Sequence, residues 1–249
     1  MPMTRIKSLS SSRKQRGFSL IELMVVLLIL SVMMAAVFQQ INLVQRRNAV
    51  EQNRVDIFEE GRSFVDQMTR DLHQAGYPNP RNFGKGYLSG PNDQHGAVGL
   101  VKVAVDQLWF EGDVVGDGNV YSVQFYLDPN GTNCPCLKRS QTVKLSGDPL
   151  TGQSSATYYS EVQGVQNGTA TNPIFQAYDI NGNLITLPVD FDNNPTTIAQ
   201  IRSIKVTVTV QSSIMDFQTR TYPITSLVSS VDLDNCSQAA TGQTMSCHP

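Results

Sequence analysis

Four cysteines, Cys134, Cys136, Cys236 and Cys247, are the residues of this 249-residue chain best suited to covalent chemistry. An even number of cysteines is typical of disulfides in an oxidising compartment. A zinc site would need closely paired thiolates, whereas here one pair is C-x-C and the other is separated by ten residues. The spacing therefore favours disulfides over zinc.

The pairing of these cysteines is open. A disulfide within Cys134-Pro135-Cys136 would close a strained ring, so each of these two cysteines is expected to bond elsewhere. Cys236 and Cys247 could close the C-terminal tail on itself, which would leave Cys134 and Cys136 paired together or reduced. Alternatively, each tail cysteine bonds one cysteine of the C-x-C run. The three connectivities are equally compatible with the sequence.

Two polar stretches are candidates for calcium, which binds clustered oxygen ligands. Their residues are Asp113, Asp117 and Asn119 in the first, and Asp190, Asp192, Asn193 and Asn194 in the second. Neither has the EF-hand spacing with its distal glutamate. Asp, Asn and Gly also form ordinary hairpin turns, and this is the favoured interpretation. No metal or cofactor is predicted.

The sequence gives little support for catalysis or for nucleic-acid binding. His73, His95 and His248 are widely separated, and no G-x-S-x-G, H-E-x-x-H or phosphate-loop motif occurs. The net charge of −2 provides no strong field for nucleic acid. We therefore predict a chain that is not an enzyme and does not bind nucleic acid.

A long apolar run extends from Phe18 to Phe38, FSLIELMVVLLILSVMMAAVF. It is long enough to cross a membrane, which takes about 20 helical residues. All charges in residues 1–17 are basic, so the positive-inside rule places this end in the cytoplasm and the rest of the chain outside. Glu22 is exceptional, because a carboxylate deep in a bilayer costs roughly 2.5 kcal/mol or more. It is either tolerated near the interface or paired with a cation during assembly.

The stretch Arg16–Val26, RGFSLIELMVV, resembles the class III signal of type IV prepilins. The resemblance implies that prepilin peptidase cuts between Gly17 and Phe18 and methylates the new N-terminus of Phe18. It also implies that Glu22 neutralises the N-terminal ammonium of a neighbouring subunit. Partners would then be the peptidase, the bacterial inner membrane before assembly, and other pilins or pseudopilins through the N-terminal helix.

The same helix is predicted to continue beyond the apolar run. From Gln39 to Ala75 there is no proline and a single glycine, Gly61, which could mark a bend, a close contact or nothing. Val65, Met68, Leu72 and Ala75 have helical spacing, and Gly76 and Pro78 supply a stop. A helix from Phe18 to Ala75 would be about 87 Å long.

The rest of the chain is predicted to be rich in β-strands, with residues 77–100 as a loop and 146–172 as a long loop or insertion. One helix followed by strands indicates an α+β fold, with an antiparallel sheet packed on the helix. The predicted parts are a leader (1–17), a transmembrane and filament-core helix (18–38), an amphipathic helix (39–76) and a periplasmic head (77–249). Strands are expected at Gln107–Glu111, Val120–Leu127, Cys136–Val143, Ile174–Tyr178, Ile201–Val210 and Gln218–Val228.

Four segments of this second half resemble minor pilins of the assembly protein W type and the type II secretion pseudopilin J. They are Arg70–Tyr77, Asp113–Gly118, Phe175–Gly182 and Ile201–Val206. The resemblance implies a minor pilin that initiates or tips a type IV pilus. The alternatives are a minor pseudopilin of a type II secretion system, or an adhesin or binding domain that only uses the membrane anchor.

Overall fold

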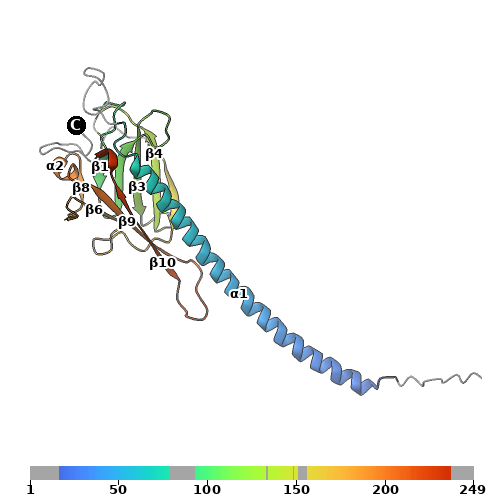
Figure 1. Cartoon of the computed structure of the whole chain (residues 1–249). Coiled ribbons are helices and arrows are strands. Elements are labelled where there is room, and N and C mark those ends of the chain that lie inside the picture. Colours follow the sequence, from blue (N-terminus) through green and yellow to red (C-terminus); the bar gives the residue numbers. More distant parts are fainter. Residues whose placement is uncertain (1–16, 79–92, 133, 148, 151–155, 237–249) are drawn as a thin grey trace, which may run out of the picture. The chain divides into compact units, whose positions relative to one another are not determined.

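A computed structural model describes residues 17–78, 93–132, 134–147, 149–150 and 156–236 (Figure 1). The chain divides into two compact units, residues 1–49 and residues 50–249. A single helix, α1 (Leu20–His73, 54 residues), begins in the first unit and ends in the second. The helix expected from Phe18 to Ala75 is therefore present and starts and ends within two residues of the prediction.

In the second unit, one stripe of α1 is buried against the head. The buried residues Gly61, Phe64, Val65, Met68 and Leu72 recur at the helical spacing that places them on one face. The helix ends where Gly76 adopts the left-handed conformation, with φ of 80°. The Gly76 N–H donates to the carbonyl oxygen of Glu111 at 2.8 Å, so the end of α1 is fixed to a strand.

Two antiparallel sheets form most of the rest of the second unit. The first has the order β5-β4-β3-β2-β1-β8 and the second the order β10-β9-β6-β7. The strands of the first sheet are β1 (Leu100–Val103), β2 (Gln107–Gly112), β3 (Tyr121–Asp128), β4 (Cys136–Val143), β5 (Tyr158–Gln163) and β8 (Val189–Asp190). The second contains β6 (Phe175–Tyr178), β7 (Leu184–Ile185), β9 (Ser203–Gln211) and β10 (Ile224–Asp232). The short helices α2 (Pro195–Ile198) and η2 (Asp234–Cys236) complete the described elements.

The buried stripe of α1 shares one hydrophobic core with both sheets. Phe64 packs edge-on against Phe125 of β3, with ring centroids 5.6 Å apart. On the second sheet, β9 alternates perfectly between buried and half-buried residues, as its sequence predicts. The predicted α+β class, with a long N-terminal helix packed on antiparallel sheets, is confirmed.

Several strand predictions need correction. β5 lies within residues 146–172, for which the sequence predicts a long loop or an insertion. As an edge strand it buries only Val162, so it lacks apolar alternation. The short strands β1, β7 and β8 were also missed, and β1 lies at the end of the loop expected at residues 77–100. The last strand begins at Ile224 rather than Gln218, because Asp216 accepts the Gln218 N–H at 2.9 Å and starts a turn.

Gly112 is required by a close approach of two backbones. A Cβ atom at this position would lie 2.3 Å from the carbonyl oxygen of Gln74, just beyond α1. Gly61 is different, since its nearest neighbour would be the terminal Cδ1 atom of Leu227 at 2.6 Å. Gly61 is therefore a close-packing point against β10, and the neighbouring side chain can turn away more easily than a backbone can.

We expect Gly112→Ala to lower the free energy of unfolding by about 1–3 kcal/mol, the usual cost of overpacking. Gly61→Ala is the matched control, because its contact is relieved by a side-chain rotation and alanine favours the helix by about 1 kcal/mol. Urea unfolding of the full chain in detergent, followed by the fluorescence of Trp109, measures both. Trp109 is the single tryptophan and is buried in the head. Equal losses of unfolding free energy in the two variants would contradict the conclusion that Gly112 is required by the close approach of two backbones.

Candidate functional site

The first candidate site is the start of α1. Gly17 and Phe18 precede the helix, and the Phe18 side chain is 81% exposed. The Leu23 N–H donates to the carbonyl oxygen of Ser19 at 3.1 Å, which starts the helical ladder. Glu22 is the acidic residue of the first turn, where the helix dipole favours a negative charge. Within the described part of the chain Glu22 forms no ion pair, so its carboxylate is available to a cation from outside.

The apolar part of α1 has no protein cover in the first unit. Every residue from 17 to 49 is exposed, including the apolar run after Glu22, which Ser31 alone interrupts. Among the described residues, α1 is the one helix long and apolar enough to cross a membrane, judged by length and composition. So large an exposed apolar surface is unfavourable in water, which favours cover by lipid or by other helices.

Comparison with known proteins identifies the kind of segment that forms the start of α1. Residues 12–38 match the family model of the prokaryotic N-terminal methylation motif. The chain therefore carries a prepilin-type class III signal, which supports a pilin-like or pseudopilin role and is consistent with anchoring in the inner membrane. No curated protein and no solved structure matches the chain.

Beyond the methylation motif, the calcium candidates use their carboxylates to hold turns. Asp113 accepts the N–H groups of Gly116 and Gly118 at 2.7 and 2.9 Å. Asp117 accepts the Asn119 N–H at 3.0 Å and the Tyr121 hydroxyl at 2.7 Å, and these bonds lower its pKa. Within the described ranges no three His, Cys, Asp or Glu residues gather at one metal-binding point.

The second stretch has the same construction. Asp190 accepts the backbone N–H groups of Asp192 and Asn193 at 3.1 and 2.7 Å, and the Asn193 side-chain amide at 2.9 Å. Asn194 lies at the N-cap of α2 without a side-chain capping bond. In both stretches most of the bonds to these carboxylates come from backbone N–H groups of the same turn, which is the turn chemistry expected of these residue types.

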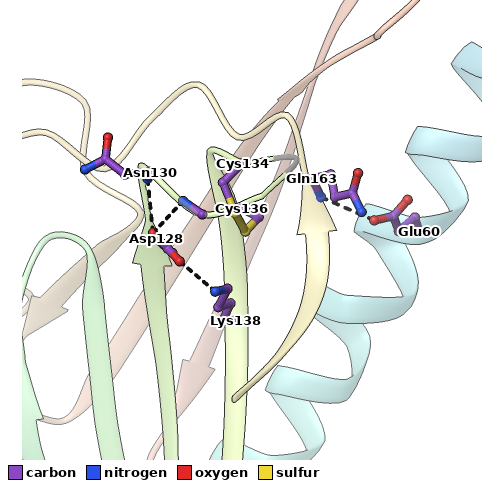
Figure 2. The surroundings of a disulfide bond; sticks show 8 residues. Glu60, Asp128, Asn130, Cys134, Cys136, Lys138 and Gln163 are labelled. Atoms are coloured by element: carbon purple, nitrogen blue, oxygen red, sulfur yellow. Dashed lines mark hydrogen bonds and ion pairs between the residues drawn. A yellow bond between two sulfur atoms is a disulfide. The ribbon is translucent and has the colours of Figure 1, made fainter.

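The structure joins Cys134 and Cys136 in a disulfide, contrary to the expectation that each bonds elsewhere (Figure 2). The reason is local: the bend into β4 places the two Cα atoms 4.4 Å apart, against about 6.6 Å for alternate residues of an extended strand. That separation lies at the lower end of the disulfide range. Cys236 ends η2 and Cys247 lies outside the described residues, so whether these two cysteines bond each other is not tested.

Two described histidines lie in different places. The His73 ring at the end of α1 is 3.7 Å from Asp234. The Nδ1 atom of His95, in the chain before β1, is 2.5 Å from Asp93. His248 lies outside the described residues. The structure thus does not bring His73 and His95 together in one constellation.

Sequence reasoning missed a buried ion pair beside β2. The Lys144 ammonium lies 2.7 Å from Oε2 of Glu111, and both side chains are fully buried. Lys144 also donates to the carbonyl oxygen of Gly96 at 2.8 Å, and the Val98 N–H donates to Glu111 Oε2 at 3.0 Å. Burial raises the pKa of Glu111, and the adjacent Lys144 opposes that rise. The available signal was a glutamate directly after the apolar residues Leu108, Trp109 and Phe110 of β2.

A second missed pair joins α1 to β4. Arg139 donates to Asp71 at 2.8 Å through Nη2 and at 3.0 Å through Nε, and it also donates to Gln141. Burial raises the pKa of Asp71 while Arg139 lowers it. Asp71 lies on the buried stripe of α1, one position before Leu72. These two pairs bind segments of the head together rather than forming a reactive site.

Proposed function

We propose that the mature chain is a minor pilin that initiates or tips a type IV pilus, with assembly rather than turnover as its activity. The observation that carries the proposal is the match of residues 12–38 to the methylation motif, directly before an apolar helix without protein cover. The four head segments that resemble assembly protein W support a minor rather than a major subunit. They lie at the end of α1, between β2 and β3, at β6 and at the start of β9.

In this proposal residues 1–17 form the leader that prepilin peptidase removes, and residues 18–38 cross the inner membrane and then enter the filament core. Residues 39–76 continue into the periplasmic head, residues 77–249. Cleavage frees the ammonium group of Phe18. In a lipid-free filament core this ammonium and the Glu22 carboxylate of a neighbouring subunit would each be costly alone. Their pairing neutralises both and fixes the axial register between subunits.

The test is the intact mass of the tagged chain recovered from sheared pili and from the membrane fraction. We expect the pilus form to lack residues 1–17 and to carry one methyl group on Phe18. Gly17→Val should leave the full-length mass in the membrane, because the residue at the cut site is no longer small. Glu22→Gln is the matched control, which should still be cleaved.

The presence or absence of the chain in sheared pili also distinguishes the alternative functions. If the chain is processed but absent from sheared pili, and if deletion of its gene stops type II secretion, the chain is a pseudopilin and not a minor pilin. A wild-type chain that keeps residues 1–17 would contradict both assignments and favour a binding domain that only uses the anchor.

A further inference from the structure

Two adjacent arginines, Arg46 and Arg47, follow the apolar run of α1. Both are exposed, and they belong to the first unit together with that run. The match to the methylation motif ends at residue 38, and the first buried residue of α1 is Val50, so neither feature includes the two arginines. They lie at the far end of a candidate membrane span, where lipid headgroups begin.

The charges along this part of α1 have one sign. From Leu23 to Ala49 the sequence contains no acidic residue, and Arg46 and Arg47 are its only charged residues. The next acid, Glu51, lies one turn beyond Arg47, on the side away from the apolar run. The apolar surface is therefore followed directly by a basic pair, which is the charge that complements an anionic phosphate layer.

The length of helix before the two arginines matches the thickness of a bilayer. Arg47 lies 27 positions after Leu20, the first residue of α1, so the helix rises about 41 Å between them. A bilayer measures about 40–45 Å with its headgroups, around a hydrocarbon core of about 30 Å. A helix that enters at one surface at Leu20 therefore brings Arg46 and Arg47 level with the headgroups of the opposite surface.

The direction of the helix also favours contact between these side chains and lipid. In an α-helix every Cα–Cβ bond tilts towards the N-terminus, and in α1 that is the direction of the apolar run. A long arginine side chain can lay its methylene groups along apolar surface and keep its charged end at the interface. The turns before Arg46 and Arg47 offer such surface, because Ile41, Leu43 and Val44 are exposed.

The two arginines also oppose the predicted orientation of the span. Basic residues close to a span favour the cytoplasmic side, whereas Arg46 and Arg47 follow the end that is predicted to be outside. The leader carries more basic residues and determines the orientation, with Arg5, Lys7, Arg13, Lys14 and Arg16. A basic pair that works against this orientation is explained by an anionic ligand at the outer surface.

We propose that Arg46 and Arg47 bind the phosphate groups of phospholipids at the outer surface of the inner membrane before assembly. A guanidinium group can donate two parallel N–H bonds to phosphate oxygens, so the contact holds both position and charge. Two such contacts at one level fix the depth of the span in the bilayer, and with it the depth of Glu22. The inference rests on the proposed function, which supplies the membrane and the orientation.

The test is solid-state NMR of the full chain, labelled with ¹³Cζ-arginine, in vesicles of phosphatidylethanolamine and phosphatidylglycerol. Dephasing of Cζ by lipid ³¹P detects arginines about 4 Å from a phosphate, the separation that direct N–H···O bonds impose. Arg46→Gln with Arg47→Gln should remove the dephased signal of two Cζ atoms. Arg54→Gln with Arg62→Gln is the matched control and should leave the dephased signal unchanged, because Arg54 already lies about 11 Å beyond Arg47 along α1. The leader arginines contribute equally to all of these samples.

An inserted chain whose dephased signal is the same with and without Arg46 and Arg47 would overturn the inference and leave the proposed function intact. An equal loss of dephased signal in the control variant would overturn it as well. If the signal is unchanged and the Arg46→Gln, Arg47→Gln chain is absent from sheared filaments, the two arginines contact another subunit and not lipid. A wild-type chain that does not insert into the vesicles would instead contradict the membrane anchor of the proposed function, and with it this inference.

Discussion

Replacing Lys144 with methionine is expected to lower the free energy of unfolding of the head by about 3–5 kcal/mol, the usual cost of breaking a buried ion pair from one side. Methionine fills similar space, so the loss comes from the Glu111 carboxylate rather than from a cavity. Glu111 Oε1 already has no hydrogen-bond partner among the described residues. Without Lys144, the single N–H of Val98 would be the described donor left to stabilise a fully buried charge.

The loss of stability in Lys144→Met should depend on pH, and its direction follows from the pKa of Glu111. Burial raises the pKa of Glu111 in the folded head above its ordinary value of 4.5, and removing Lys144 removes the charge that opposes this rise. A folded-state pKa above the unfolded value means that the folded head binds the proton more tightly. The variant should therefore gain stability as the pH falls from 7 towards 4.5, and lose it again as the pH rises.

Urea unfolding of the full chain in detergent, followed by Trp109 fluorescence at pH 7 and pH 5, measures both effects. Lys138→Met is the matched control, because its partner Asp128 remains exposed enough to be hydrated, and it should cause a smaller loss. Lys144→Met combined with Glu111→Leu should recover much of the stability, since no lone charge is then buried. A double variant as unstable as the single one would show that packing, not charge, causes the loss.

The buried ion pairs could not be predicted from the sequence, whereas the long helix could. The apolar run after Phe18 and the helical spacing from Val65 to Ala75 predict α1 almost to the residue, because both signals are local and periodic. The alternation in β9 is equally local. In contrast, Glu111 and Lys144 are 33 positions apart along the chain, and Asp71 and Arg139 are 68 apart. Partners so distant are set by the fold and not by any pattern within one segment.

The missed disulfide and the displaced last strand have a different cause. In both cases a turn overrode the expected geometry: the bend at Pro135 brings Cys134 and Cys136 together, and the Asp216 turn delays β10 until Ile224. The N-terminal signal, by contrast, is contained in consecutive residues, so the sequence alone is enough to identify it.

Glu22→Ala is expected to reduce the amount of the chain in sheared filaments at least about tenfold. In the proposed filament core, the variant leaves the Phe18 ammonium of one neighbour without its counter-ion. An uncompensated buried charge costs several kcal/mol, and 1.4 kcal/mol already corresponds to a factor of ten. The head should be unaffected, because Glu22 lies in the first unit and forms no ion pair within the described part of the chain.

The measurement is the ratio of the chain in sheared filaments to the chain in membranes, together with pull-down of other pilins. Glu51→Ala provides the matched control, because it removes one exposed acid from the same helix outside the apolar run. Glu22→Gln separates the contribution of charge from that of hydrogen bonding, since an amide can still accept a hydrogen bond but carries no charge. Glutamine should fail nearly as severely as alanine if charge neutralisation is the cause. Normal filament incorporation of Glu22→Ala, with an unchanged Trp109 unfolding midpoint, would remove Glu22 from the assembly mechanism and leave it as a tolerated residue at the membrane interface.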